Sequence, residues 1–455
     1  MRQHAPSACV VNLGCRVNRV ESDRMSTDLL REGFVLADEE AADVIVINTC
    51  AVTGEAEAKT RKAVRHALAR PRGPWVVVTG CVVNLNAGEL TALGERVVAE
   101  PAKTRVAASA RALFPEDAAA GIVPPRADVA AGDPLTAHGE APLPHGAHLA
   151  DVLGRCRLGV KIQDGCNHRC SYCIVWKARG PETSVPADDV VAEVRAAAAD
   201  GVPEVVLTGV NLGRYRDRTG TGEPLAVEGL LGRILDETGV GRVRLSSIEP
   251  MDVSPALSAR MAADPLRVAP FLHLPLQSGC TATLRRMRRP YTGEGFLQTV
   301  RRLRADVPGI ALSCDVIVGF PGETEAEFAE SLALCEEAGF SRMHVFRYSA
   351  RPGTPAAEMS GQVDPQVMAE RSARMRELAD RLARRDAAAR AGTRERAVVE
   401  AVGADGSATG TLGSFHRALI EPGSDLAVGD LVDVAIMGLD GAGRLTARPL
   451  GRGHA

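Results

Sequence analysis

Three short apolar segments of this chain end in a cysteine, and this repeated ending is the strongest constraint on how the chain folds. The segments CVVNLGC, DVIVINTC and WVVVTGC close at Cys15, Cys50 and Cys81, and each cysteine follows a glycine or a threonine. Runs of valine and isoleucine are typical of parallel strands buried on both faces. One such cysteine would be read as a small buried hydrophobic residue. Three at the same place indicate a shared role.

Helical patterns separate the three segments. Amphipathic stretches over 21–34 and 54–70, and a shorter one over 86–95, predict helices, the first ended by Gly33. A strand–helix repeat of this kind predicts a parallel sheet with right-handed crossovers, whose strands end at one shared edge. We therefore expect the three thiols to meet at that edge, although they are far apart along the chain. Buried core thiols are the alternative interpretation.

The chain divides into four regions, and its expected fold class is α/β. Residues 1–114 form a predicted N-terminal parallel α/β domain. Residues 115–150 are rich in proline, alanine and glycine, lack hydrophobic periodicity, and are predicted to be a linker. Residues 151–391 alternate strands and helices again. Residues 392–455 carry short strand patterns and Gly-Asp turns that predict a small β-barrel.

The third region contains six predicted strands with helices between them. The strands are expected at 157–163, 204–209, 242–247, 271–276, 310–319 and 342–346, and helices at 187–200, 293–306, 325–339 and 364–391. A closed TIM barrel has eight such units. Six predict an open, partial (β/α)6 TIM-like barrel with its chemistry at the carboxyl ends of the strands.

A second group of cysteines follows the first strand of this barrel. Cys166, Cys170 and Cys173 have C-x3-C-x2-C spacing in the segment KIQDGCNHRCSYC. Three soft thiolates within eight residues can hold three corners of an iron–sulfur cubane and leave one iron open to a ligand. The alternative is a structural zinc site with His168 as its fourth ligand.

Composition narrows the class of protein. Eleven cysteines in a large chain without a secretory leader favour metal or redox chemistry over disulfides, and we expect a cytoplasmic protein. No segment approaches the ~20 apolar residues of a membrane span. The net charge of −3 gives no global attraction to nucleic acid, so any RNA contact must come from local basic groups.

The two cysteine groups and several other motifs resemble a known family. The C-x3-C-x2-C loop after the first barrel strand, together with DVIVGFPGE, resembles radical S-adenosylmethionine (SAM) enzymes. The N-terminal cysteines and a C-terminal barrel of the TRAM type make nearly the whole chain similar to the methylthiotransferases. The motifs NLGCRVN, INTCAVT, VTGC, HLPLQSG and RMRRPYT further resemble the branch that acts on threonylcarbamoyladenosine in tRNA.

The resemblance implies two 4Fe–4S clusters and SAM as cofactors. The cluster that binds SAM would be held by Cys166, Cys170 and Cys173, and the auxiliary cluster, which carries the sulfur, by the three N-terminal cysteines. The implied reaction inserts a methylthio group at carbon 2 of N6-threonylcarbamoyladenosine-37, in the anticodon stem-loop of tRNA. No catalytic residue is expected beyond the cluster ligands. A reducing electron donor such as flavodoxin, and a monomeric enzyme, are also expected.

Four positions at the ends of predicted barrel strands are candidates to contact SAM. They are Gly209, Glu249, Gln277 and Gly319. Backbone amides of the segment around Gly209 could meet the SAM carboxylate, the segment around Gly319 resembles the family's adenine-contacting segment, and the two polar side chains could bind SAM or substrate. Ordinary turns and loop caps explain the same residues equally well.

Basic residues supply candidates for RNA or ligand contact. They are the segment 284–291, Arg301, Arg302, Arg304, the arginine-rich helix beyond Arg371, and Arg179 just after the cysteine loop. Solvated helix faces are the alternative for most of them. The C-terminal barrel is the RNA module by resemblance, but it has few basic residues and Phe415 as its one aromatic.

Two other functions remain open. The same chemistry could act on isopentenyladenosine in tRNA or on an aspartate of a ribosomal protein. A protein of another class, a non-catalytic metal protein that binds RNA, would bind metal without cleaving SAM.

Overall fold

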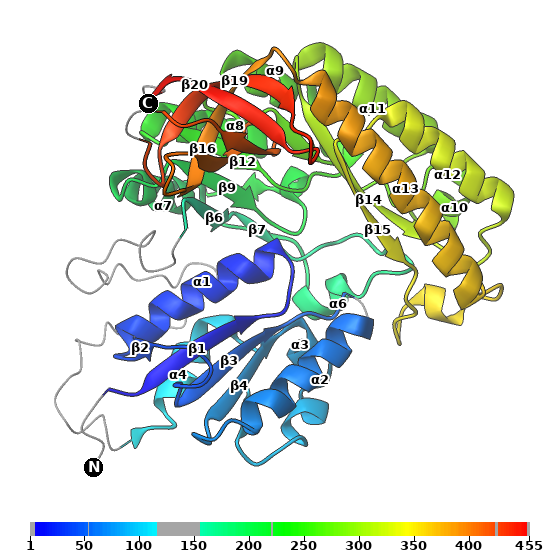
Figure 1. Ribbon diagram of the computed structural model, residues 1–455. Helices are drawn as coiled ribbons and strands as arrows, with labels where there is room; N and C mark the ends of the chain where they lie inside the picture. Colours follow the sequence, from blue (N-terminus) through cyan, green and yellow to red (C-terminus); the bar gives the residue numbers. More distant parts are fainter. Residues whose placement is uncertain (1–4, 53, 116–154, 220–221, 424–425, 453–455) are drawn as a thin grey trace. The chain divides into compact units, whose positions relative to one another are not determined.

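The described residues of the computed structural model fall into two units (Figure 1). The structure describes residues 5–52, 54–115, 155–219, 222–423 and 426–452. The first unit holds the described residues up to 115 together with 164–168 and 173–185, and the second unit holds the remainder. Apart from its first residue, the predicted linker 115–150 lies outside the described residues.

The first unit is built on a five-stranded parallel sheet. Its strands are β1 (Ser7–Asn12), β2 (Val35–Leu36), β3 (Val44–Thr49), β4 (Trp75–Gly80) and β5 (Val97–Ala99), in the spatial order β2-β1-β3-β4-β5. The strands that precede the three cysteines are neighbours, because Val11 lies opposite Ile47 and Ile47 lies opposite Val78. The predicted parallel α/β architecture is confirmed.

Helices follow the strands of this sheet. They are α1 (Arg16–Arg31), α2 (Gly54–Leu68), α3 (Cys81–Thr91) and α4 (Val106–Arg111), with a 3-10 turn η1 (Lys103–Arg105) before the last. Two of them begin earlier than expected, α1 at Arg16 and α3 at Cys81, and α3 has a kink at Asn86. The first turn of α1 carries mostly polar residues, so the apolar helical pattern can be recognised in the sequence only further along the helix.

Both faces of the sheet are covered by helices, which explains why β3 is buried along its whole length. Ile45 and Ile47 pack on one side with residues of α2 and α3, whereas Val44 and Val46 pack on the other with residues of α1 and α4. Successive side chains of a strand point to opposite faces. A continuous apolar run is therefore what a sheet between two helical layers requires.

The second unit contains the predicted partial barrel. Its strands are β6 (Arg157–Lys161), β9 (Glu204–Thr208), β12 (Arg242–Leu245), β13 (Phe271–His273), β14 (Ala311–Val318) and β15 (Arg342–Arg347). They form two parallel three-stranded sheets, β12-β9-β6 and β13-β14-β15, joined by parallel bridges such as that between Ser247 and His273. The prediction of six parallel strands in an open barrel is confirmed.

Helices and short elements connect these strands. The helices are α7 (Ala187–Ala199), α8 (Val227–Glu237), α9 (Pro255–Ala263), α10 (Thr281–Arg286), α11 (Gly293–Asp306), α12 (Glu325–Ala338) and α13 (Pro365–Ala389). The short elements are β7 (Gln163–Asp164), α6 (Val175–Arg179), β8 (Thr183–Ser184), η3 (Leu212–Arg214), β10 (Arg216–Asp217), β11 (Leu225–Ala226), η4 (Pro250–Asp252) and η5 (Pro355–Glu358). Among the described helices, none has both the length and the apolar character needed to cross a bilayer.

The C-terminal strands close into the predicted small barrel. They are β16 (Arg394–Val402), β17 (Ala408–Leu412), β18 (Arg417–Ile420), β19 (Leu431–Leu439) and β20 (Leu445–Arg452), in the order β16-β17-β18-β20-β19. Closure removes the free strand edges that would otherwise pair with other chains.

Two buried arginines of β12 join the partial barrel to the C-terminal barrel. Arg244 donates hydrogen bonds to the carbonyls of Leu412 and Gly413, at 2.9 and 2.7 Å. Glu204 accepts from Arg244 at 2.9 Å and also from Arg242. Burial opposes the charge of Glu204, but the guanidinium groups of these two arginines overcome it and lower its pKa to about 2.

Phe415 lies in the same contact. Its ring centre is 4.8 Å from that of Phe271, and the guanidinium carbons of Arg244 and Arg342 lie 4.8 and 5.1 Å from it. These are aromatic and cation–π contacts. The one aromatic of the C-terminal barrel is therefore packed against the strands of the partial barrel, which removes it as a stacking platform for an RNA base.

Candidate metal centres

The structure brings the three N-terminal thiols to the carboxyl edge of adjacent strands. Cys50 directly follows β3, Cys81 directly follows β4 and opens α3, and Cys15 caps the start of α1 just beyond β1. Cys50 and Cys81 are buried, and Cys15 is exposed. Two buried thiols and one exposed thiol therefore share this sheet edge.

The electrostatics of Cys50 are dominated by its burial. Burial, together with negative charge on Cys15 and Cys81, raises its pKa to about 11, against the opposing effects of the backbone amide of Val52 and the charge of Arg179. The neutral thiol is favoured without a metal, so ligation must displace its proton. Three soft sulfur donors within mutual electrostatic reach suit an iron–sulfur cluster with one open iron.

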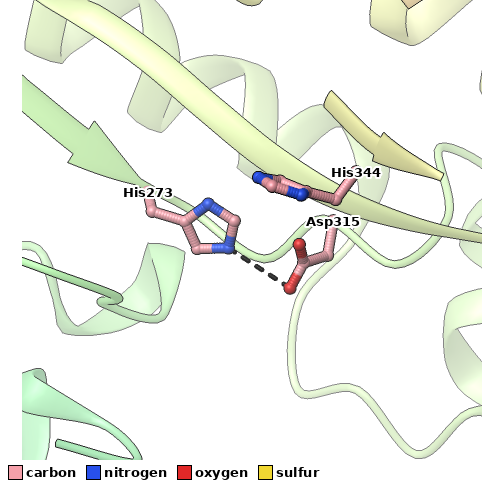
Figure 2. Close-up of side chains that lie close together, drawn as sticks. All are labelled: His273, Asp315 and His344. Carbon is pink, nitrogen blue, oxygen red and sulfur yellow. Dashed lines mark ion pairs between the residues drawn. The ribbon is translucent and has the colours of Figure 1, made fainter. Parts of the chain in front are cut away.

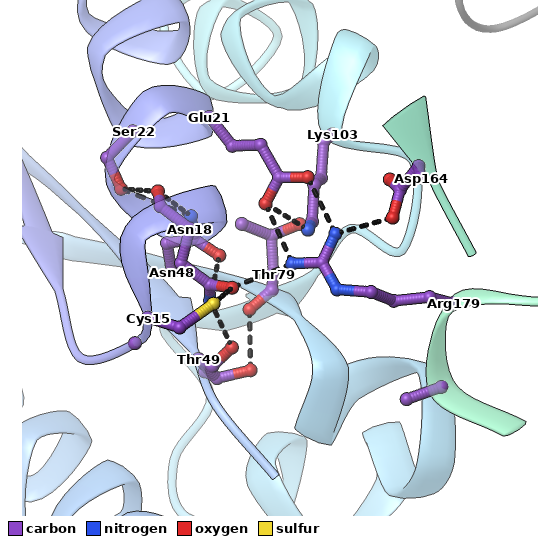
Figure 3. Close-up of polar contacts among 12 residues, drawn as sticks. Cys15, Asn18, Glu21, Ser22, Asn48, Thr49, Thr79, Lys103, Asp164 and Arg179 are labelled. Carbon is purple, nitrogen blue, oxygen red and sulfur yellow. Dashed lines mark hydrogen bonds and ion pairs between the residues drawn. The ribbon is translucent and has the colours of Figure 1, made fainter. Parts of the chain in front are cut away.

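An amide network fixes the loops that carry these thiols (Figure 3). The side-chain amide of Asn18 donates to Oδ1 of Asn48 at 3.2 Å and to the carbonyl of Thr49 at 2.8 Å. The thiol of Cys15 donates to Oδ1 of Asn18 at 3.5 Å. Since Asn18 lies in the first turn of α1, these bonds tie the start of that helix to the end of β3. Asn18 belongs to the motif NLGCRVN, which was the only sequence signal for it.

The end of β4 is held against β3 in a similar way. The hydroxyl of Thr49 donates to the carbonyl of Thr79 at 2.7 Å and accepts from the amide of Val82 at 3.1 Å. Gly80 has a φ of +95°, and a Cβ there would lie 2.6 Å from the carbonyl oxygen of Thr49. Glycine is therefore required before Cys81, because only it permits this φ and this close approach.

Arg179 is buried in an ion-pair network within the first unit (Figure 3). Its guanidinium donates to both oxygens of Glu21 at 2.9 and 3.2 Å, to Asp164 at 2.9 Å and to Asn18 at 2.7 Å. Lys103 also pairs with Glu21. Burial disfavours the charge, yet the two carboxylates hold the pKa of Arg179 well above its usual range. A solvated role for Arg179 is thus contradicted: it fastens the segment after the cysteine loop to the N-terminal sheet domain.

The loop with C-x3-C-x2-C spacing is shaped by its own backbone. The amide of Cys166 donates to the carbonyl of Gly180 at 3.1 Å, and the sulfur of Cys173 accepts from the amide of Val175 at 3.4 Å. Gly165 has a φ of +69°, and a Cβ there would lie 1.8 Å from the carbonyl oxygen of Pro181. This approach fixes the path of the loop just before the first of its cysteines.

Cys170 has an arginine beside its sulfur. The guanidinium of Arg289 donates to Sγ of Cys170 at 3.1 Å, to the hydroxyl of Tyr291 at 3.1 Å, and to the carboxylate of Glu249. Arg289 is buried, and although burial lowers its pKa, the net effect of Tyr172 and Glu249 raises it. The guanidinium therefore lies directly beside one of the three sulfurs proposed to hold a cluster. The prediction that segment 284–291 contacts RNA is therefore wrong for Arg289, which is buried.

The other basic candidates are mostly paired with acids or carbonyls. Arg286 pairs with Glu327, Arg301 with Glu294 and Glu337, Arg302 with Asp306, Arg371 with Glu323, and Arg304 donates to the carbonyls of Ala338 and Gly339. These contacts support the interpretation of structural and solvated helix faces rather than of a continuous phosphate-binding strip.

The four candidate SAM positions lie beyond the carboxyl ends of barrel strands. Gly209 follows β9, and a Cβ there would lie 3.0 Å from Gln163. Glu249 follows β12 and pairs with an arginine as described above. Gln277, beyond β13, has a φ of +65°, which is strained for a residue with a side chain. Gly319 follows β14 with a φ of +73°. Sheets built from βα units bind ligands at strand ends of this kind. The SAM contacts of these four residues remain predictions.

Comparison with known proteins identifies the broad class of this chain. Residues 160–335 match the Radical SAM superfamily, and residues 7–99 match the uncharacterized protein family UPF0004. Among solved structures, the radical S-adenosylmethionine methyltransferase TsrM from Kitasatospora setae, with cobalamin and a 4Fe-4S cluster bound, aligns with a TM-score of 0.53. It is 16% identical and the alignment covers 77% of each chain, so the likeness is one of fold.

Two relatives identify the family within this superfamily. The threonylcarbamoyladenosine tRNA methylthiotransferase MtaB of Treponema pallidum is 36% identical, over 82% of this chain and 87% of its own. The tRNA-2-methylthio-N(6)-dimethylallyladenosine synthase of a Parafrankia species is 37% identical, over 90% and 81%. The chain therefore belongs to the radical SAM methylthiotransferases. Membership makes it an enzyme that uses SAM and a 4Fe–4S cluster, as the cysteine loop predicted.

Proposed function

We propose that this enzyme adds a methylthio group to carbon 2 of N6-threonylcarbamoyladenosine-37 in tRNA. The observation that carries the proposal is the convergence of Cys15, Cys50 and Cys81 on one sheet edge, in a chain that also has the C-x3-C-x2-C loop. SAM cleavage needs one cluster only. A second set of three thiols supports a second cluster, whose open iron would carry the sulfur that is inserted.

The residues around each set suggest what the chain itself contributes. Cys166, Cys170 and Cys173 would hold the cluster that binds SAM, and the N-terminal set the auxiliary cluster. The bound clusters and SAM supply the one-electron and sulfur chemistry. Arg289 supplies positive charge at Cys170, and the Asn18 network keeps the thiol loops in place. The candidates Gly209, Glu249, Gln277 and Gly319 would line the SAM side of the barrel.

A basic cavity in the second unit supports an RNA substrate. It has a volume of about 580 Å³ and lies among β15, α13 and the C-terminal barrel. Its lining includes Arg342, Arg384, Arg417 and Arg444, together with Asp380. Arg444 pairs with Asp440 at 2.8 Å and Arg417 with Glu400 at 3.7 Å, so an RNA phosphate would replace these acids as their partner. Clustered arginines are what phosphate neutralisation requires. We propose this cavity, rather than Phe415, as the place where the C-terminal barrel meets the tRNA backbone.

The choice of nucleoside rests on the motifs around the N-terminal cysteines. Relatives named for threonylcarbamoyladenosine and for dimethylallyladenosine have similar identities to this chain, so identity alone does not separate them. The motif INTCAVT around Cys50 favours threonylcarbamoyladenosine as the substrate. A cytoplasmic location and an electron donor such as flavodoxin belong to the same proposal.

Nucleoside analysis after anaerobic turnover tests the proposal. The enzyme is reconstituted with iron and sulfide and then incubated with SAM, a reductant, and one of two tRNAs, bearing either threonylcarbamoyladenosine or isopentenyladenosine. We expect about eight irons per chain and a methylthio product from the first tRNA only. A product from the second tRNA alone would overturn the substrate. Zinc in place of iron, with SAM intact, would overturn the two-cluster proposal.

A cysteine outside both sets supplies a matched control. Cys9 lies in β1, a strand of the same sheet, and packs against the apolar core. Cys9→Ala should keep the full iron content and form product. Loss of iron in Cys9→Ala as large as in Cys50→Ala would argue that these substitutions damage the fold rather than a cluster site.

A further inference from the structure

Three metal-ligating side chains, none of them a cysteine, meet on neighbouring strands of the partial barrel. His273 ends β13, Asp315 lies in the middle of β14, and His344 lies in β15. The register places His273 opposite Ser313 and Asp315 opposite His344. Since registered neighbours in a parallel sheet share a face, and Ser313 and Asp315 are two residues apart, all three side chains lie on one face.

The distances suit a single cation (Figure 2). Nε2 of His273 lies 3.2 Å from Oδ2 of Asp315, and one ligand atom from each residue lies within 4.8 Å of the others. Bond lengths of about 2.0–2.2 Å put two adjacent ligand atoms about 2.8–3.6 Å apart in octahedral or tetrahedral coordination. The His273–Asp315 pair already has this spacing. His344 is exposed, so a side-chain rotation can close the remaining gap.

The hydrogen bonds around His273 leave the right nitrogen for a metal. Nδ1 of His273 lies 2.9 Å from the hydroxyl of Ser313. With Nδ1–H donating to that oxygen, Nε2 carries a lone pair and faces Asp315. Metal-binding histidines are usually oriented by a hydrogen bond of this kind from the other ring nitrogen.

A second serine–histidine–aspartate group in the chain, that of Ser414, His416 and Asp386, serves as a comparison. His416 Nε2 lies 3.2 Å from Asp386, and its Nδ1 lies 3.0 Å from Ser414. There, Arg390 also pairs with Asp386 at 3.1 Å and balances its charge. Among the described residues, Asp315 has no arginine or lysine within ion-pair distance, and it has a second histidine instead.

We propose that His273, Asp315 and His344 bind one divalent transition-metal cation of the Zn²⁺ or Mn²⁺ type. Imidazole is a borderline donor that suits Zn²⁺, carboxylate is a hard donor that suits Mn²⁺, and three protein ligands leave coordination positions open. The site contains no thiolate, so it is chemically distinct from both cysteine sets. It does not depend on the proposed tRNA substrate.

Manganese binding to the reconstituted enzyme tests the site. Mn²⁺ is the probe because it prefers oxygen and nitrogen donors, and loaded clusters keep the thiolates occupied. The signal of free Mn²⁺ in room-temperature electron paramagnetic resonance reports how much is bound. We expect one equivalent for the wild type, and loss of that equivalent in His344→Ala and Asp315→Asn. Ser313→Ala should weaken binding about 10- to 100-fold.

Asp386→Asn is the matched control, because Asp386 also pairs with a histidine but its charge is balanced by Arg390. It should bind Mn²⁺ as the wild type does. Iron content and circular dichroism show whether each variant is folded, and His344→Ala changes only an exposed side chain. The proposal is overturned if the wild type takes up no Mn²⁺ at millimolar concentration, or if His344→Ala binds it with unchanged stoichiometry and affinity.

Discussion

Replacing Glu204 by glutamine should loosen the C-terminal barrel. The change leaves the guanidinium groups of Arg242 and Arg244 buried without their carboxylate, although both keep their bonds to backbone carbonyls. Removing one partner of a buried ion pair costs about 3–5 kcal/mol. The pKa of Glu204, lowered to about 2 by the two guanidinium groups, has the sign expected of a carboxylate that the pairing stabilises, although burial also lowers the pKa of Arg242, to about 10.

Hydrogen exchange measures this loss locally, which matters because a chain with two units need not unfold in one step. A loss of about 3 kcal/mol should speed exchange of the most protected amides of β16 and β17 about 150-fold. Glu237→Gln is the control, because Glu237 pairs with Arg233 on the surface of α8. An exposed pair of this kind contributes about 0–1 kcal/mol.

The pH dependence checks the cause. The folded-state pKa of Glu204 is lowered, so its contribution is fully present above the ordinary pKa near 4.5 and is lost as the pH falls through about 2. The difference between wild type and Glu204→Gln should therefore be constant from pH 8 to about 5 and shrink below it. A difference under about 1 kcal/mol at pH 7, or one that grows on acidification, would refute the reasoning.

Three further predictions concern the cysteines, a strand-end glycine and the buried arginine. Cys166→Ala should abolish 5′-deoxyadenosine formation, whereas Cys50→Ala should retain part of it and form no methylthio product; full product from Cys50→Ala, measured by mass spectrometry, would contradict the auxiliary cluster. Gly319→Ala should lower the thermal midpoint more than Gly429→Ala, because both have positive φ but a Cβ at Gly319 would lie 2.3 Å from a methionine side chain and one at Gly429 would meet nothing; equal shifts would refute the steric argument. Arg179→Ala should destabilise the first unit by about 3–5 kcal/mol in urea unfolding, since it leaves buried carboxylates short of a partner, and a loss no larger than that of a surface arginine would contradict this.

Much of the fold follows from local sequence patterns. Short strand patterns bounded by turns marked β3, β4 and the six barrel strands. In β3 and β4 the continuous apolar run also showed that the strand is buried on both faces. Helical periods marked α2, α11 and α12 in the same way. The rule that parallel strands end at a common edge then places Cys15, Cys50 and Cys81 together from the sequence alone.

Tertiary structure decided which side chains face one another. Nothing local to Arg179, Arg289 or Phe415 shows that the first is held by acids of the N-terminal domain, that the second lies at Cys170, or that the third packs against barrel arginines. The same holds for His273 and Asp315, which come from strands 40 residues apart and meet only through their register. Periodicity is a property of a short segment, whereas register and packing depend on the combined shape of segments distant in the chain. The sequence therefore determined the elements and the edge where the thiols gather, and the folded chain alone determined the partners that surround them.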